Sequence, residues 1–95
     1  MPYTYRREMT ITHADFFRLL PRALGSENFS REENEMTYIN GKFSMQVSIS
    51  PQSKWSIGAL SLPKTQVVIT MNGCDDQEAQ DRIQKFDQAY QKGGG

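Results

Sequence analysis

The sequence lacks an excess of charge, a second cysteine and a long apolar run, and each absence excludes a class of protein. Its 95 residues contain eleven basic and eleven acidic side chains, so the formal net charge is zero. This balance argues against the general phosphate attraction that nucleic-acid and anionic-membrane binders carry. No stretch is apolar for long enough to cross a bilayer, and the first ten residues lack the apolar core of a secretion signal.

Cysteine and histidine are each present once, as Cys74 and His13. A single cysteine forms no internal disulfide, and these two residues cannot assemble a zinc site. We therefore expect a reducing, cytoplasmic setting and no metal or other cofactor. A nucleophilic pair of Cys74 with His13 would require two strand–helix junctions to meet, and no third orienting group can be named. The simpler interpretation is that Cys74 packs beneath a helix start.

The first part of the chain predicts a strand followed by a helix. Residues 3–11 alternate apolar and polar side chains, with Arg7 out of the pattern. The spacing then becomes helical, with Thr12 as the N-cap and Gly25 as the left-handed stop. Pro21 lies inside this helix, so we expect a kink or a restart there.

The middle of the chain predicts a loop and then a hairpin. Residues 26–35 are polar and mostly acidic, which indicates a surface loop running into a strand. Asn40-Gly41 predicts a tight turn that places Tyr38 opposite Phe43. Side chains directly opposite share a face, so the hairpin predicts one apolar surface. Its members are Met36, Tyr38, Phe43, Met45, Val47 and Ile49.

The apolar alternation continues further along the chain, but with a change of phase. It resumes at Trp55 and Ile57, and again from Val67 onward. A turn at residues 62–65 would put these two stretches one residue out of phase. We therefore predict a β-bulge at Gly58-Ala59, which would supply the extra residue.

Residues 75–91 predict the last helix. Asp75 is a good N-cap, and Glu78 at the third position makes the cap reciprocal. The apolar side chains at helical spacing form a narrow stripe, while the remaining positions are polar, so the helix lies on the outside of the domain. The stripe consists of Ala79, Ile83, Phe86 and Tyr90.

Together these elements predict one α+β domain over residues 1–92, followed by a flexible glycine tail, residues 93–95. The order β-α-β-β-β-β-α favours a two-layer sandwich, with an antiparallel sheet of about five strands and both helices on one face. This order resembles that of one TATA-box-binding-protein repeat, or of a shortened helix-grip domain. The resemblance lies in the element order and implies nothing about activity.

The second face of this sheet has no predicted cover, which makes it the candidate binding surface. Its side chains are short, uncharged and able to hydrogen-bond, so they suit docking of another backbone or an identical sheet. The predicted binding residues are Thr37, Ser44, Gln46, Ser48, Ser56, Gln66 and Thr70. The aromatic residues point to the other face, so base stacking is not favoured. A solvated face without a partner is the alternative.

The chain ends in Gly93, Gly94 and Gly95. In this it resembles the ubiquitin-like sulfur carriers, which end in Gly-Gly. The resemblance covers the final glycines and implies that the terminal carboxylate of Gly94-Gly95 is activated or modified. The alternative is a left-handed helix stop at Gly93 followed by a flexible tail.

From these patterns we expect a small non-catalytic binding domain whose partner is another protein or a second copy of the chain. Neither nucleic acid nor a membrane is an expected partner. Two alternatives remain open. One is the carrier with a modified terminus, and the other is a small enzyme with a pocket between the first helix, opened at Pro21, and the sheet.

Overall fold

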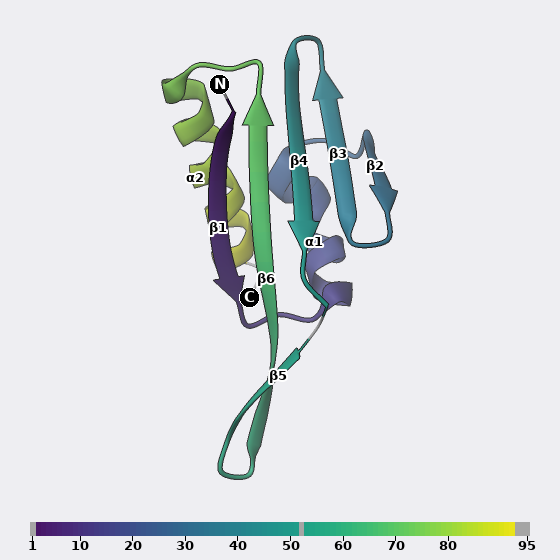
Figure 1. Ribbon diagram of the computed structural model, residues 1–95, viewed down its shortest axis with the longest axis vertical. Helices are drawn as coiled ribbons and strands as arrows, with labels where there is room; N and C mark the ends of the chain where they lie inside the picture. Colours follow the sequence, from purple (N-terminus) through teal and green to yellow (C-terminus); the bar gives the residue numbers. More distant parts are fainter. Residues whose placement is uncertain (1, 52, 93–95) are drawn as a thin grey trace.

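The structure is an antiparallel sheet with two helices packed on one face, which confirms the predicted two-layer α+β fold (Figure 1). The computed structural model describes residues 2–51 and 53–92. The elements in chain order are β1 (Tyr3–Met9), α1 (His13–Leu24), β2 (Phe29–Glu32), β3 (Glu35–Asn40), β4 (Phe43–Ile49), β5 (Ser53–Ile57), β6 (Leu60–Asn72) and α2 (Asp76–Lys92). The main sheet has the order β1-β6-β4-β3-β2, and β5 pairs with β6 beyond it.

The side of the central strands that faces the helices is apolar. Burial alternates residue by residue along β4, as the predicted period of two requires. The surface predicted from the hairpin is buried in full: Met36, Tyr38, Phe43, Met45, Val47 and Ile49. Strand β6 adds Val67, Ile69 and Met71 to the same core. The side chains of Trp55 and Ile57, predicted to extend this surface, lie outside the described residues.

Both helices begin where their capping residues predict, and α1 ends at the predicted glycine. The Thr12 hydroxyl accepts a hydrogen bond from a first-turn N–H at 3.2 Å, and Gly25 ends α1 with a φ of 72°. Asp75 caps α2 by accepting from the Glu78 N–H at 2.8 Å. Pro21 lies inside an uninterrupted helix, so the predicted restart is wrong. Buried residues precede and follow the proline, and their packing holds both halves of α1 on one core.

Three aromatic rings join the two helices. Phe16 of α1 stacks on Tyr90 of α2 with the ring centroids 5.1 Å apart, and the Phe86 centroid lies 4.9 Å from that of Tyr90. The Tyr90 hydroxyl donates a hydrogen bond to the Phe16 carbonyl at 2.9 Å. The next carbonyl, that of Phe17, loses its helical donor because Pro21 has no N–H. Burial raises the pKa of Tyr90 well above its ordinary value.

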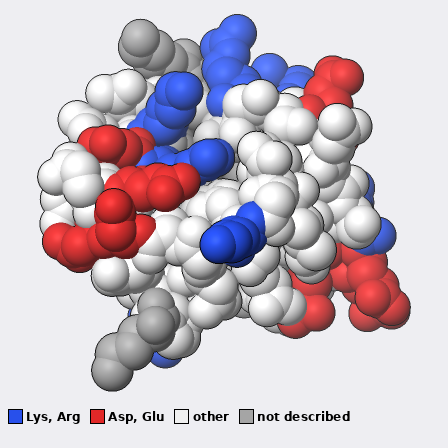
Figure 2. Space-filling view, turned by 90° about the horizontal axis from the view of Figure 1, so that it is seen from above, with Lys and Arg blue, Asp and Glu red and all other residues white. Residues whose placement is uncertain are grey.

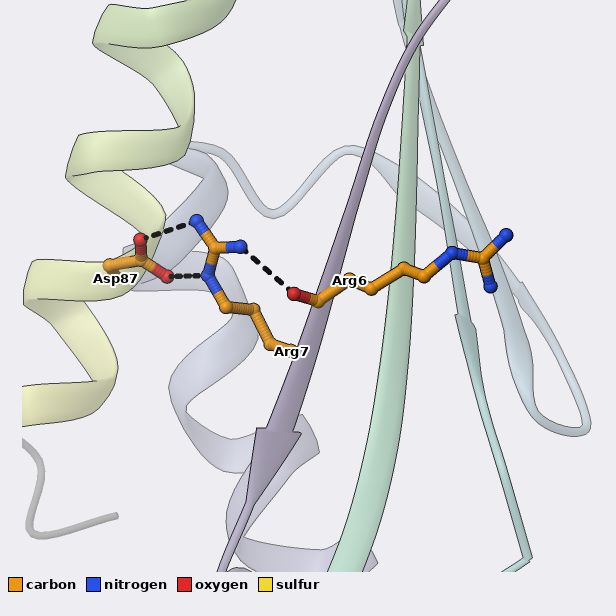
Figure 3. Close-up of polar contacts among 3 residues, drawn as sticks. All are labelled: Arg6, Arg7 and Asp87. Atoms are coloured by element: carbon orange, nitrogen blue, oxygen red, sulfur yellow. Dashed lines mark hydrogen bonds and ion pairs between the residues drawn. The ribbon is translucent and has the colours of Figure 1, made fainter.

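Charged side chains of opposite sign lie next to one another on the end of the molecule seen from above (Figure 2). The best-defined pair joins β1 to α2, because Arg7 donates hydrogen bonds to both carboxylate oxygens of Asp87, each at 3.0 Å (Figure 3). Such two-point contacts fix geometry as well as adding energy. Arg7 thus interrupts the apolar alternation of β1 because it faces α2 and is neutralised there.

A short strand, β2, occupies part of the region predicted to be a loop. It pairs with β3 across a turn at Glu33 and Asn34, where Glu33 has a φ of 52°. The residues of β2 after Phe29 are exposed, so no alternation marks the strand in the sequence. Phe29 itself packs against the core.

The β3–β4 hairpin forms where predicted, but its register differs by two residues. Tyr38 lies opposite Met45 and not opposite Phe43, because the turn centres on Gly41 and Lys42. Gly41, with a φ of 63°, takes the first central position, as in a type II′ turn. A shift of two residues leaves every side chain on its face, so the burial prediction holds although the pairing was wrong.

Strand β5 and the first part of β6 form an arm beyond the main sheet (Figure 1). Its turn is Gly58-Ala59, so the bulge predicted there is wrong, and so is the predicted turn around Pro63, which lies inside β6. The extra residue that the change of phase requires lies earlier in the chain, between β4 and β5. Three residues separate Ile49 from Ser53 along the chain, whereas two residues separate their partners, Val67 and Lys64, in β6. The Ser50 hydroxyl accepts from the Gln66 N–H at 2.9 Å and supports this irregular step.

Gly73 is a point of close backbone approach, which generates a stability test. Its φ is 74°, and a Cβ added there would overlap the backbone of Lys42. Gly41 is the matched control, because its φ is also positive but the space around it is open. We expect Gly41→Ala to lower the free energy of unfolding by about 1–2 kcal/mol. Gly73→Ala should lower it by about 1–3 kcal/mol more in urea unfolding, and equal losses would contradict the contact.

The buried Tyr90 phenol predicts a loss of stability at alkaline pH. Its pKa is raised in the folded protein, whereas the unfolded chain ionises near the ordinary value of 10.0. Unfolding above that pH therefore releases a proton, and the free energy of unfolding falls by up to about 1.4 kcal/mol per pH unit for this group.

Replacement of Tyr90 by phenylalanine keeps the ring and removes the ionisable group. Tyr90→Phe should cost about 1 kcal/mol at neutral pH, because the Phe16 carbonyl loses a donor. It should also make the alkaline decline less steep. Urea unfolding from pH 8 to pH 11 measures both effects, and an unchanged decline would show that Tyr90 does not cause it.

Candidate functional site

The face of the sheet turned away from the helices carries a row of uncharged polar residues across five strands. The strand register places them side by side: Ser30, Thr37, Gln46, Thr70 and Thr4. Directly opposite side chains lie about 4.5–5.5 Å apart, so the row is a continuous strip of hydroxyl and amide groups. In Figure 1 both helices lie behind the sheet and this face is turned to the viewer. We call it the open face.

The charges of the next row lie near the two edges of the open face. Across the sheet this row consists of Glu32, Glu35, Ser48, Val68 and Arg6. The Ser48 hydroxyl donates to the Glu35 carboxylate at 3.4 Å. In these two rows the acidic groups lie on the β2–β3 side and the cation on β1, so β4 and β6 present an uncharged centre.

Six of the seven predicted binding residues share the open face. They are Thr37, Ser44, Gln46, Ser48, Gln66 and Thr70. Gln46 and Gln66 are exposed, and the other four are half-buried among their neighbours. Ser56 lies apart, opposite Ser61 in the arm, because the chain turns at Gly58-Ala59. A binding role for these residues stays a prediction.

Several residues of the open face are not among the predicted binding residues, and three of them, Ser30, Thr4 and Ile39, extend its uncharged part. Ser30 lies in the region that the sequence predicts to be a loop, and Thr4 lies on the polar side of the first strand, which the predicted binding residues do not include. Ile39 lies opposite Ser44 and is 67% exposed. Its place directly after Tyr38 was a usable signal, because successive strand residues point to opposite faces. Ile39 gives one end of the polar face an apolar contact point.

The open face can recognise a partner by hydrogen bonding. Hydroxyl and amide groups supply both donors and acceptors, which can pair with a backbone or with polar side chains. The rows contain no histidine or cysteine that could act as a base or nucleophile. Within residues 2–51 and 53–92, no group of three metal-ligating side chains occurs.

Cys74 and His13 do not form a pair in the structure. Gly73, beside Cys74, lies against Lys42 at the start of β4, whereas the His13 Nε2 atom lies 2.8 Å from the carbonyl oxygen of Ser50, just past the end of that strand. A strand of this length spans about 20 Å. Cys74 is half-buried against the core, in agreement with packing beneath a helix start.

A groove of about 610 Å³ opens between the end of α1, α2 and the sheet. Tyr38 and Met45 contribute to its floor, and its α2 wall carries charges of both signs. The charged residues of that wall are Glu78, Asp81, Arg82 and Lys85. The Arg82 guanidinium lies over the Phe43 ring, 4.2 Å from its centroid. The groove therefore lies at the C-terminal end of α1, beyond the position of Pro21 where the sequence predicts a pocket.

Two further expectations concern the C-terminal glycines and membrane association. Gly94 and Gly95, the candidate modified terminus, lie outside the described residues, as does the rest of the predicted tail. The carrier hypothesis therefore stays a prediction. The described helices are too short or too polar to span a bilayer.

Cys74 should be a slow nucleophile. Burial raises the pKa of its thiol, and the carboxylates of Glu78 and Asp75 raise it further. The thiolate is the reactive form, so iodoacetamide should alkylate the folded protein at least about tenfold more slowly at pH 7 than the urea-unfolded chain. A time course followed by intact mass measures both rates. If the folded protein reacts as fast as the unfolded chain, Cys74 returns as a candidate for chemistry.

Comparison of the chain with protein-family models, curated proteins and solved structures gives no significant match. No relative therefore supplies an activity, a ligand or a partner. The surfaces of the molecule itself are therefore the basis for assigning a function.

Proposed function

We propose that this chain is a small non-catalytic binding domain that docks another protein on the open face of its sheet. The observation that carries the proposal is the uncharged row from Ser30 to Thr4, which crosses the whole main sheet. Charged side chains are depleted at the centres of protein interfaces, because burying a charge without a partner is costly. The open face has the same distribution, with its charges near the edges.

The size of the side chains supports a docking role. Serine and threonine lose little rotamer entropy when a partner covers them, so a larger share of the contact energy is available for binding. Exposed Gln46 and Gln66 lie on the adjacent strands β4 and β6 and offer amide groups to a partner. Exposed Ile39 would add an apolar contact at one end.

We assign the protein to the cytoplasm and give it no catalytic role. The single cysteine, Cys74, suits a reducing compartment. Cys74 and His13, the nucleophile and base that the sequence suggested as a pair, lie apart. A second copy of the chain is the other occupant that an uncharged face would accept.

The groove beside α2 supports a second candidate function, the binding of a small polar ligand. Its volume, about 610 Å³, lies within the range of small-molecule sites. Arg82, Lys85, Glu78 and Asp81 could orient a ligand that carries both charge signs. The Glu78–Arg82 pair, 3.8 Å apart, already satisfies part of this charge, which makes the groove the weaker candidate.

The test is a variant that charges the centre of the open face. Gln46→Lys combined with Ser48→Glu leaves the net charge unchanged but places two ions beneath any docked partner. A protein captured from cell extract by the wild-type chain, then purified, should bind this variant at least about tenfold more weakly. Titration by calorimetry measures the change.

The matched control carries the same pair of charges on the exposed surface of α2, as Gln84→Lys with Gln88→Glu. Both control positions line the groove. Unchanged affinity of the control together with weakened binding by the open-face variant supports the proposal. Weakened binding by the control, with unchanged affinity of the open-face variant, would place the binding site in the groove. Full affinity of both variants would show that the open face does not bind the partner.

A further inference from the structure

Strand β1 is the longer of the two edge strands of the main sheet. It contains seven residues, whereas β2, at the other edge, contains four. An edge strand leaves backbone N–H and C=O groups unpaired every second residue, and a long edge needs either protection or a partner. β2 is short and polar, which is itself a form of protection. β1 is long, so its unpaired backbone groups are the ones that need protection or a partner.

We propose that β1 pairs antiparallel with β1 of a second copy, about a two-fold axis at Arg7. In this register Arg6 of each copy lies opposite Glu8 of the other, so both exposed charges find an opposite charge. Moving the axis to Arg6 or to Glu8 would bring identical charges together, which disfavours those registers. The charges on this edge therefore disfavour general strand addition but complement themselves in one arrangement.

Arg6 is available for this contact. Its side chain is exposed on the side away from α2, and it has no ion-pair partner among the described residues (Figure 3). Glu8 lies 3.4 Å from Lys64, and its carboxylate is well exposed. A carboxylate has two oxygens and can accept from both cations.

The side chains on the helix side of β1 fit the same register. Tyr5 and Met9 are half-buried against the edge of the core, and an axis at Arg7 puts Tyr5 of one copy opposite Met9 of the other. Thioether–aromatic contacts of this kind are favourable. A hollow of about 410 Å³ beside Met9, Asp87 and Tyr90 leaves room for the incoming ring.

The position of Arg7 on the axis does not oppose the pairing. Two Arg7 side chains would meet there, but each is already neutralised by the Asp87 of its own α2, with both contacts at 3.0 Å. Arg7 also donates to the Arg6 carbonyl at 2.9 Å (Figure 3), and this oxygen has a second lone pair that can accept from an N–H of the partner strand. The pair of copies would form one continuous sheet with both open faces on the same side. This proposal stands whether or not the open face binds a partner.

Charge reversal and its rescue test the register. The wild-type chain should show a concentration-dependent monomer–dimer equilibrium in sedimentation. Arg6→Glu and Glu8→Arg should each weaken the dimer at least about tenfold, because each creates two like-charge contacts about the axis. The double variant Arg6→Glu with Glu8→Arg restores opposite charges and should return the dissociation constant to within about threefold of the wild type. Lys42→Glu, at the exposed β3–β4 turn and separated from β1 by β6, is the control and should leave the dissociation constant unchanged.

Circular dichroism of each variant checks that the fold is intact, and hydrogen exchange gives a second measurement on the wild type. Amides of β1 should exchange more slowly at high protein concentration, while those of β2 should not change. A single monomeric species at every concentration up to roughly 1 mM would overturn the proposal. So would a dimer that the single reversals leave intact, or one in which the double variant is as weak as the single variants.

Discussion

Phe16, Phe86 and Tyr90 hold α1 against α2, and this contact places both helices on the same face of the sheet. A chain of this length provides one helical layer, and an antiparallel sheet tolerates solvent on its other face. The hydrogen bond from Tyr90 to the Phe16 carbonyl fixes the two helices along their length as well as side by side. The open face, and any function placed on it, follows from this one-sided packing.

The sequence predicted which side of each central strand is buried, because a period of two depends only on neighbouring residues. It did not predict the pairing, because a shift of two residues in the β3–β4 hairpin leaves the same side chains buried. The alternation of apolar and polar residues also showed that one extra residue was needed between β4 and β6, but the alternation alone cannot locate it. Gly58-Ala59 looked suitable because of its glycine, whereas the register changes between Ile49 and Ser53, where the Ser50 hydroxyl accepts from the Gln66 N–H in place of a backbone carbonyl.

The centre of the open face was largely predictable from the sequence, whereas its part on the edge strand β2 was not. Its central residues follow from the alternation of β4, whereas Ser30 depends on a strand whose exposed residues carry no periodic signal. Arg7, which interrupts the apolar alternation of β1, proved to be informative. A charged residue on the apolar side indicates an opposite charge on another element, but the sequence alone could not say which of eleven acidic residues it was. The pairing with Asp87 depends on how α2 crosses the sheet, which is a property of the packed molecule.

The most direct test of this account compares adjacent positions on β4. Single cysteines at Gln46 and at Val47, each in a Cys74→Ser background, report which face of the strand is open. The account predicts that Gln46→Cys reacts with a thiol reagent nearly as fast as an unfolded peptide does, while Val47→Cys reacts about a hundredfold more slowly, because it needs local opening. Equal rates, or faster reaction at Val47→Cys, would contradict the one-sided packing on which the fold and the proposed functions rest.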